Sequence, residues 1–415
     1  MIIKEIPEPL VDVDGPLQFQ PALLDYNDYV GRIGIGRIQR GKIHVNESVT
    51  CVRADGSHTQ FRIQKLYGFI GLHRIEIEEA SAGDIVAIAG LADIGVGETV
   101  CTTGQEEALP LLHVDEPTIQ MVFGTNTSPF AGQDGKFVTA RQIEERLFKE
   151  TNRDVSLKIE RIQNKEEWIV SGRGELHLSV LIENMRREGY EFAVSKAEVL
   201  YHYDENGKKL EPMEIAVIDV PEEFTGAVIE KLSQRKGELQ NMTAANGGYA
   251  RLEFSIPSRG LIGYRGEFMT DTKGNGILNT LFDGYGPYKG DIQYRKQGSL
   301  IAYEAGETIT YGLFNAQERG TLFVGPGEKV YGGMVIGQTG KTEDIEINVC
   351  RSKKLTNTRA SGSDDALKLS PPKILSLEQA LEFIDTDELL EITPENIRIR
   401  KKILDPTMRK RAKFS

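Results

Sequence analysis

The sequence has few cysteines and no long apolar run. Its three cysteines, Cys51, Cys101 and Cys350, lie far apart, with no CxxC pair and no histidine at metal-ligand spacing. We therefore expect neither a disulfide framework nor a zinc site. The longest apolar run, around residues 85–92, is far below the roughly 20 residues that cross a bilayer. The N-terminal residues carry acids and prolines where a secretory signal needs a basic start and an apolar stretch. These absences predict a cytoplasmic protein in a reducing compartment, with no membrane partner.

The composition is that of a soluble globular protein with several domains. Of the 415 residues, 39% are hydrophobic and 27% are charged, and the 43 glycines favour turns and strands over a helical bundle. Because one ordinary domain takes roughly 100–200 residues, the length predicts about three or four domains.

The net charge of −12 conceals two basic segments near the C-terminus. Residues 351–361 and 397–415 together hold 12 of the 50 lysines and arginines but only one of the 62 acidic residues, Asp405. This uneven distribution of charge along the sequence indicates a local contact with a polyanion, while acidic surfaces elsewhere limit nonspecific adhesion. A solvated basic tail is the alternative that the charge pattern alone leaves open.

Residues 1–110 predict a small antiparallel β-barrel. From Gly15 to about Leu109, short alternating runs are divided by glycines. The dipeptide Asp55-Gly56, which lies between two such runs, is a hairpin signal. The regular spacing of the runs and turns is typical of a barrel.

Residues 111–203 and 204–290 each show the order strand, helix, strand, strand, helix, strand, which is the split βαβ or ferredoxin-like arrangement. In the first unit the helices are expected over 139–151 and 175–187, with a capping box of Thr139 and Gln142 at the first. In the second unit they are expected over 225–236 and 259–270. Two such units in tandem are an internal repeat of architecture, although their sequences barely resemble each other.

Residues 291–415 predict a mainly β C-terminal domain with one helix and a basic loop over 351–370. The helix is expected to begin at Ser376, with Gln379 completing its capping box. Residues 397–400 alternate as a strand would, so that the isoleucines face the core while Arg398 and Arg400 project together toward solvent or RNA. The predicted fold class is therefore multidomain α+β.

Two glycine-rich motifs are superficially typical of nucleotide binding or catalysis. The segment 337–342, GQTGKT, lacks the first glycine of a phosphate-binding loop, because Val335 stands in its place, and we interpret it as an ordinary turn between strands. In the segment 171–178, SGRGELHL, Glu175 and His177 have no nucleophile or orienting partner in the sequence, so we expect structural roles for both. No catalytic, cofactor-binding or metal-binding residue is predicted.

The most particular string of the chain is PSRGLIGYRGEFMTDTKGNG over 257–276, which continues as ILNTLFDGYGPYKG to Gly290. It resembles the corresponding segment of the TypA/BipA translational GTPases. The loop 351–370 is similar to the KKLTN-RASG loop of their C-terminal domain, and SGRGELHL is similar to an element in the third domain of elongation factor G and its relatives. This resemblance covers essentially the whole chain. It implies a barrel like domain 2 of elongation factor Tu, two domains like the third and fifth of translational GTPases, and the family's own C-terminal domain.

The resemblance implies a ribosome-binding role in translation regulation and in ribosome assembly under stress. The expected partners are rRNA and A-site tRNA at the ribosomal factor site, and the expected state is a monomer. GTP and magnesium would bind in an N-terminal GTPase domain that has no counterpart in these residues. The chain therefore looks like a C-terminal portion with no cofactor of its own, and we expect that it is not an enzyme.

Three groups of RNA-contacting residues follow from the resemblance and the charge pattern. Arginine pairs with phosphates bidentately, tyrosine stacks on bases and glycine lets a backbone approach closely. The glycines of 257–276 are poor helix formers, costing about 1 kcal/mol each relative to alanine, so a close approach is expected there. The candidates are Lys353, Lys354, Asn357 and Arg359 in the loop, Arg259, Tyr264 and Arg265 in the first helix region, and Arg398, Arg400, Lys401 and Lys402 near the C-terminus.

Two other functions stay open at the level of sequence. One is a free-standing RNA-binding or chaperone-like protein built on the same domains, which ribosome co-sedimentation would distinguish. The other is an unrecognised enzyme, which a bound cofactor or metal would favour. Among translation factors, elongation factor G and LepA are the runner-up assignments, and the strings GLIGYRGEF and GNGILNTLFDGYGPYKG point away from both.

Overall fold

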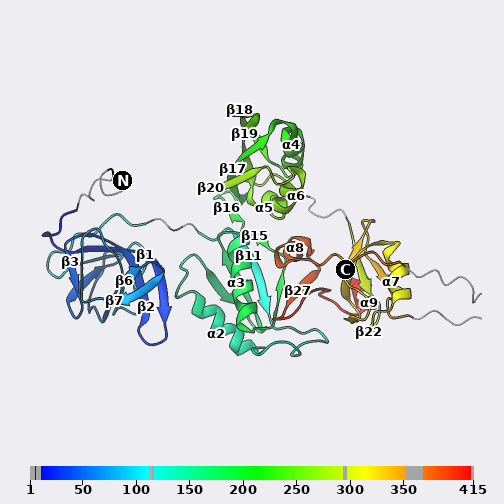
Figure 1. Ribbon diagram of the computed structural model, residues 1–415, viewed down its shortest axis with the longest axis horizontal. Coiled ribbons are helices and arrows are strands. Elements are labelled where there is room, and N and C mark those ends of the chain that lie inside the picture. The colour runs from blue at the N-terminus through cyan, green and yellow to red at the C-terminus, as the bar shows by residue number, and fades with distance from the viewer. Residues whose placement is uncertain are drawn as a thin grey trace, which may run out of the picture. The chain divides into compact units, whose positions relative to one another are not determined.

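The computed structural model describes residues 5, 11–112, 114, 116–245, 247–292, 297–351 and 368–412. The chain divides into two compact units, one of residues 1–116 with 144–159 and one of residues 117–143 with 160–415. Figure 1 shows the elements of both, coloured from blue at the N-terminus to red at the C-terminus. Within the described ranges, no helix combines the length and the apolar character that a membrane crossing requires.

The first unit contains the predicted barrel strands. Its strands are β1 Gln18–Asn27, β2 Gly31–Arg40, β3 Lys42–His44, β4 Ser48–Val52, β5 His58–Arg62, β6 Lys65–Ile70, β7 His73–Glu76, β8 Glu79–Ser81, β9 Ile85–Ala89 and β10 Thr99–Thr102. Eight of them form one sheet in the order β5-β4-β10-β1-β2-β9-β6-β7, and β3 pairs with β8. Phe19, Ile38 and Val49 are fully buried in its core. The hairpin prediction is confirmed: β4 and β5 pair across a turn in which Gly56 has φ +79° and Asp55 Oδ1 accepts from the Ser57 amide.

The first ferredoxin-like unit has the predicted element order. Its elements are β11 Ile119–Gly124, α2 Ala140–Glu150, β12 Lys158–Arg161, β13 Glu167–Gly172, α3 Glu175–Glu188 and β14 Phe192–Ser195. The strand order β12-β13-β11-β14 places the first strand in the middle of the sheet, as the split βαβ arrangement requires. The capping box of α2 is confirmed, because the Gln142 amide donates to Thr139 Oγ1 and the Thr139 amide donates to Gln142 Oε1.

The second ferredoxin-like unit repeats this order. Its main elements are β17 Lys209–Pro221, α4 Thr225–Gln234, β18 Glu238–Ala245, β19 Tyr249–Pro257, α5 Ser258–Leu261, α6 Tyr264–Asp271 and β20 Ile277–Pro287. The first strand again lies centrally, because β17 pairs with both β19 and β20, and β18 pairs with β19. Short elements flank it: β15 Glu198–Val199, β16 His202–Tyr203 and the 3₁₀ turn η1 Glu222–Phe224. One face of the sheet buries Ile218, Leu252 and Phe254 in the core of this unit, and Figure 1 shows α4, α5 and α6 grouped on one side.

The helix predicted over 259–270 is broken, which corrects the sequence-based expectation. α5 ends at Leu261 and α6 begins at Tyr264, because Gly263 between them adopts φ +70°. The other two glycines allow close approach to atoms of this chain. A Cβ at Gly260 would lie 2.5 Å from the Arg235 carbonyl oxygen, and one at Gly266 would lie 2.9 Å from Glu382 Oε2. The glycines of this segment therefore serve internal packing.

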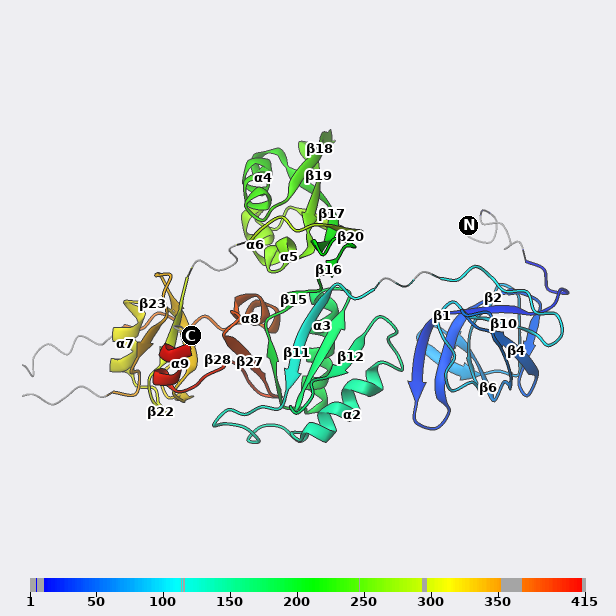
Figure 2. The same ribbon diagram turned by 180° about the vertical axis from the view of Figure 1, so that it is seen from behind.

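The C-terminal region continues the first ferredoxin-like sheet. Strand β27 (Glu388–Ile392) pairs with β14, with Val194 opposite Leu390, and the sheet runs on through β28, β25, β21 and β26. Both ribbon views show β27 beside the β11 sheet (Figures 1 and 2). The other elements are β21 Ser299–Ala302, β22 Gly306–Glu307, α7 Thr310–Gln317, β23 Gly320–Leu322, β24 Lys329–Val330, β25 Met334–Thr339, β26 Ile345–Ile347, α8 Leu377–Phe383, β28 Ile397–Lys401 and α9 Pro406–Ala412. The capping box at Ser376 and Gln379 is confirmed. The domain boundaries at 110, 203 and 290 stay a prediction.

Candidate nucleic-acid interface

Four of the predicted RNA contacts, Lys353, Lys354, Asn357 and Arg359, lie outside the described residues. The other seven lie within them and differ sharply in exposure. Arg265 on α6 and Lys402 after β28 are exposed. Arg259, Tyr264, Arg398, Arg400 and Lys401 have partners within the chain and little or no exposed surface. The interactions of these five side chains within the chain explain their burial.

Arg259 neutralises a fully buried carboxylate. Its guanidinium donates to both oxygens of Glu211, which has no exposed surface, and Nη2 also donates to the Gly290 carbonyl at 2.6 Å. The Lys289 amide donates to Glu211 Oε1 at 2.7 Å. The Arg259 side chain is itself only 6% exposed. The prediction that Arg259 faces RNA is therefore not supported by its position, which joins β17, α5 and the end of β20.

Tyr264 lies in the core of the second ferredoxin-like unit. It has no exposed surface, its ring centroid is 5.9 Å from that of Phe268, and the Arg235 guanidinium lies over it at 5.4 Å. Burial raises the pKa of the Tyr264 phenol far above its usual value. The ring is not available to stack on a base, which corrects the expectation for this residue.

The expectation that Arg398 and Arg400 project together into solvent is also wrong. Both do lie on the same side of β28, but that side is covered. Glu391, opposite Arg398 on β27, lies 3.7 Å from each guanidinium. Arg398 further contacts Asp134 at 3.4 Å, and Arg400 donates to Thr127 Oγ1 at 2.9 Å. The segment that precedes α2 therefore folds over these two arginines and withdraws them from solvent.

Tyr331 completes this buried cluster. Its hydroxyl donates to Glu391 Oε1, and burial together with the Glu391 charge raises the pKa of the phenol strongly. Burial works against the charge of Asp134, but hydrogen bonds from Asn396 and Thr393 and the Arg398 charge hold the pKa of the carboxyl below its usual value. The cluster therefore places the carboxyl groups of Asp134 and Glu391 against the two guanidinium groups.

Lys401 is the centre of a second buried cluster. Its side chain is 2% exposed, and its ammonium lies 2.7 Å from Asp344, 3.0 Å from Asp387 and 3.0 Å from Glu388. Burial alone would lower the pKa of Lys401, but the three carboxylates outweigh it and raise the pKa. Ser299 donates to Glu388 at 2.6 Å. This lysine ties β28 to the segments before β26 and β27.

A carboxylate junction lies where α3, α6 and α8 approach one another. Glu175 at the start of α3 accepts a 3.4 Å hydrogen bond from the Gly263 amide, and Glu382 of α8 lies against Gly263 and Gly266. Burial, followed by the charges of Glu175 and Glu267, raises the pKa of Glu382 to about 7. Burial likewise raises the pKa of Glu175.

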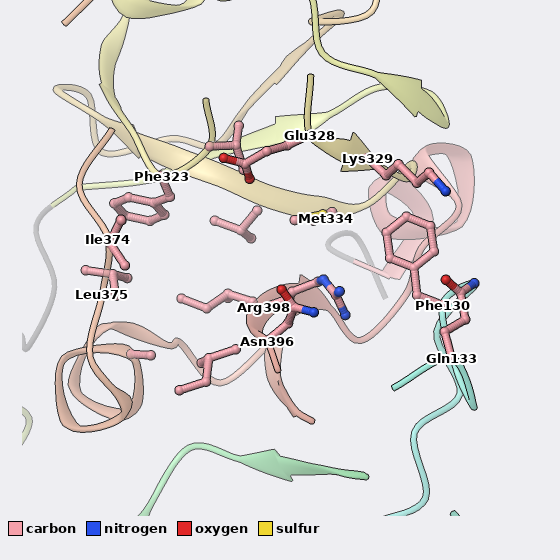
Figure 3. A pocket seen from close by; sticks show the side chains of 15 residues that line it. Phe130, Gln133, Phe323, Glu328, Lys329, Met334, Ile374, Leu375, Asn396 and Arg398 are labelled. Atoms are coloured by element: carbon pink, nitrogen blue, oxygen red, sulfur yellow. The ribbon is translucent and has the colours of Figure 1, made fainter. Parts of the chain in front are cut away.

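A cavity of about 350 Å³ lies between the segment before α2 and the C-terminal strands. Figure 3 shows Phe130 and Gln133 at one end, with Phe323, Ile374 and Leu375 at the other. Its one guanidinium, that of Arg398, is already engaged by carboxylates. Most of the lining residues are apolar, and the other cation that lines the cavity is the exposed Lys329, which lies beside Glu328 in the sequence.

The two glycine-rich motifs have structural roles. The GQTGKT segment is the end of β25 and the turn after it. In SGRGELHL, the Arg173 amide donates to His177 Nδ1 at 3.3 Å, which fixes the turn between β13 and α3. Among the described ranges, no group of three or more histidine, cysteine, aspartate or glutamate side chains could hold a metal ion.

Four family models match consecutive parts of the chain. They are elongation factor Tu domain 2 over 31–101, elongation factor G domain III over 138–196, the elongation factor G C-terminus over 208–296 and the TypA/BipA C-terminal domain over 297–406. The order agrees with the barrel, the two ferredoxin-like units and the C-terminal region described above. These matches confirm the predicted set of translation-factor domains.

Curated relatives match nearly the whole chain. The large ribosomal subunit assembly factor BipA of Bacillus subtilis is 51% identical over 412 residues, covering 99% of this chain and 67% of its own length. The chain belongs to the BipA family. The proteins of the same name from Haemophilus influenzae and Escherichia coli K12 are 53% and 50% identical, again over 99% of this chain and over 67% and 68% of their own lengths.

These BipA relatives correct one sequence-based prediction. The expectation that the chain is merely a C-terminal portion, and for that reason not an enzyme, is wrong. The match to BipA proteins runs along 99% of the chain and about two thirds of theirs, so the chain aligns with most of the length of these proteins. The prediction failed because it turned the lack of one phosphate-binding motif in the given residues into a statement about activity.

The sequence analysis of this BipA-family chain did not identify Lys165 and Lys196 as candidate site residues. Lys165 and Lys196 line a second cavity together with Arg400 and Lys402. They are isolated along the sequence, so no basic segment draws attention to them. The pairing of β13, β11, β14, β27 and β28 brings the four cations together, and Lys165 and Lys196 are paired there with Glu167 and Asp385.

Proposed function

We propose that this chain acts on the large ribosomal subunit as a BipA-type translational GTPase with a role in subunit assembly. The observation that carries the proposal is the 51% identity, over 99% of the chain, to a protein named large ribosomal subunit assembly factor BipA. GTP and magnesium, which the family resemblance implies, stay a prediction for this chain. So do action under stress, the contact with A-site tRNA and the monomeric state.

Exposed cations carry the RNA contact in this proposal. Of the predicted cations within the described residues, Arg265 and Lys402 are exposed, and Lys353, Lys354 and Arg359, which lie outside the described residues, stay candidates from the sequence. Arg259, Arg398, Arg400 and Lys401 are engaged by carboxylates of this chain. Exposed lysine and arginine attract RNA phosphates, whereas a buried, neutralised guanidinium adds little to the external field.

Salt dependence of ribosome binding measures how many cations take part. Each phosphate contact contributes roughly 0.7 to 0.9 to the slope of log affinity against log salt. Five contacts therefore give a slope of about −4, whereas all nine predicted cations would give a slope of about −7. The chain is sedimented with purified large subunits between 50 and 300 mM potassium chloride, with small subunits as a comparison. No pelleting with large subunits at the lowest salt would refute the proposal.

Charge reversal of the loop cations tests where the contact lies. The triple variant Lys353→Glu, Lys354→Glu, Arg359→Glu is expected to weaken pelleting by at least about tenfold, because three phosphate contacts become repulsive. The same variant, footprinted on rRNA with A-site tRNA bound, shows whether tRNA protections disappear with the loop charges. Unchanged affinity would place the contact elsewhere on the chain.

The matched control carries the same change in charge at other exposed positions. Lys42, Lys208 and Arg319 are exposed, and none has an ion pair within the described residues. The triple variant Lys42→Glu, Lys208→Glu, Arg319→Glu is expected to bind large subunits within about twofold of the wild type. An equal loss in both triple variants would mean that net charge, rather than the loop, governs binding.

A further inference from the structure

The last residue of α7 holds the C-terminal end of the basic loop 351–370. Gln317 Nε2 donates to the Lys368 carbonyl at 3.0 Å, and Gln317 Oε1 accepts from the Ser370 amide at 3.0 Å. A side-chain amide offers a donor and an acceptor side by side, so it binds the two backbone groups that flank Leu369 much as a neighbouring strand would. One side chain therefore fixes the backbone of residues 368–370.

The first turn of α7 contacts the chain just before the same loop. The Ile309 amide donates to the Val349 carbonyl at 3.0 Å, and a Cβ at Gly312 would lie 2.4 Å from that oxygen. The helix thus packs directly on this backbone, and Val349 is buried. Because α7 has eight residues, it is about 12 Å long. One short helix therefore contacts the chain on both sides of the loop.

The fold of the C-terminal region does not depend on the Gln317 contacts. Lys368 and Ser370 are exposed, so water can satisfy their backbone groups when Gln317 is removed. Leu369 packs against the core of this region, and the Lys373 amide donates to a carbonyl of β23 at 2.8 Å. These contacts keep the segment on the domain in any case. The Gln317 amide adds the direction in which the end of the loop runs.

We propose that Gln317 is a positioning residue for the RNA contact of the basic loop. An end of a loop that is already held in one direction loses less conformational freedom when the loop binds. Gln317 carries no charge, so it acts through the loop and not by attracting phosphate itself. The inference deepens the proposed function and rests on it for the identity of the RNA.

The test compares Gln317→Ala with a matched control on the same helix, Asn315→Ala. Asn315 is exposed, and its amide donates within α7, to the Tyr311 carbonyl at 3.0 Å. Both variants are made in the full chain and lose one side-chain amide. Hydrogen exchange of the Ser370 amide measures how well the end of the loop is held. Binding is measured by pelleting with large subunits and by filter binding to protein-free rRNA extracted from them.

Gln317→Ala is expected to raise exchange of the Ser370 amide about tenfold, because two hydrogen bonds are lost. It is expected to weaken rRNA binding about fivefold, and the salt slope should change by less than about 0.5 because the phosphate contacts keep their number. In the background of the loop charge-reversal triple variant, Gln317→Ala should change rRNA affinity by less than about twofold. Asn315→Ala is expected to stay within about twofold of the wild type in every measurement.

Three results would overturn the inference. Faster exchange with unchanged rRNA affinity would show that the Gln317 contacts are structural only. An equal loss of affinity with and without the loop charges would mean that Gln317 acts through another surface. Unchanged exchange of the Ser370 amide would show that Gln317 does not hold the loop in solution.

The inference and the proposed function fail in different ways. If the wild type pellets with large subunits and Gln317→Ala binds as tightly, only the role of Gln317 falls. If the wild type does not pellet, but Gln317→Ala weakens rRNA binding through the loop, the role of Gln317 stands and the ribosomal function falls. If the wild type binds neither large subunits nor rRNA, both fall.

Discussion

Replacing Arg259 with alanine is expected to destabilise the second ferredoxin-like unit by about 3 to 5 kcal/mol. The substitution removes the two guanidinium donors of Glu211, which has no exposed surface, and leaves it only the Lys289 amide. Removing one partner of a buried ion pair costs this much because the other charge stays buried and uncompensated.

Hydrogen exchange of the β17 amides is the suitable assay, because unfolding of a multidomain chain is not two-state. Residues 214–219 pair with β20, so their exchange reports opening of this unit. A loss of 3 kcal/mol corresponds to about a hundredfold faster exchange. Glu211→Gln added to Arg259→Ala is expected to recover at least about 1 kcal/mol, because the amide carries no charge to strand.

The matched control is Arg251→Ala on the neighbouring strand. Arg251 pairs with Asp219 at 2.8 Å, but its side chain is 52% exposed. Exposed pairs contribute at most about 1 kcal/mol, so β17 exchange is expected to change less than fivefold or so. If Arg259→Ala leaves exchange unchanged and instead weakens ribosome pelleting, the structural role of Arg259 is refuted and its predicted RNA contact is supported.

Three further predictions concern the C-terminal half. Because the pKa of Glu382 is raised to about 7, its contribution to the stability of the folded chain falls as pH rises from about 4.5 to 7. The variant Glu382→Gln should therefore show a flatter pH dependence of stability in urea melts at pH 5 to 8. At pH 8 it should be more stable than the wild type by about 1 kcal/mol, after allowance for solvent screening. Ser376→Ala removes the capping box of α8 and should cost about 1 kcal/mol, measured by exchange of the helix amides. Gly263→Ala places a side chain on a residue with φ +70° and should cost about 1 to 2 kcal/mol of stability, measured by the midpoint of thermal unfolding. Its control is Gly226→Ala in α4, where the space around the glycine is open, and this variant should be neutral or stabilising.

Most of the element order could be predicted from the sequence, because local signals specify it. The dipeptide Asp55-Gly56 and the pair Ser376 and Gln379 fix their turn and cap through contacts within a few residues. The strand-helix-strand order of both ferredoxin-like units follows from periodicity in the same way. The family models confirm these domains. Local sequence signals were sufficient to predict a turn or a helix cap wherever the interacting residues are close in sequence.

The exposure of the basic residues could not be predicted, because their partners are distant in sequence. Alternation along β28 correctly places Arg398 and Arg400 on one side of the strand, but it does not say what covers that side. Asp134 and Thr127 do so from more than 250 residues away. Likewise, the glycines before α6 signalled a close approach without naming the approaching group, which in the structure includes Glu382.

Buried carboxylates change how the charge of this chain should be counted. Glu211, Glu388 and Glu391 have no exposed surface, and each engages basic or hydroxyl groups from segments far apart in sequence. Buried ion pairs add little net stability, but breaking one is costly, so they favour one arrangement of strands over others. Part of the acidic excess therefore neutralises internal cations rather than forming an acidic surface. It follows that runs of lysine and arginine along the sequence overstate the charge that RNA can meet, because several of these cations are neutralised inside the chain.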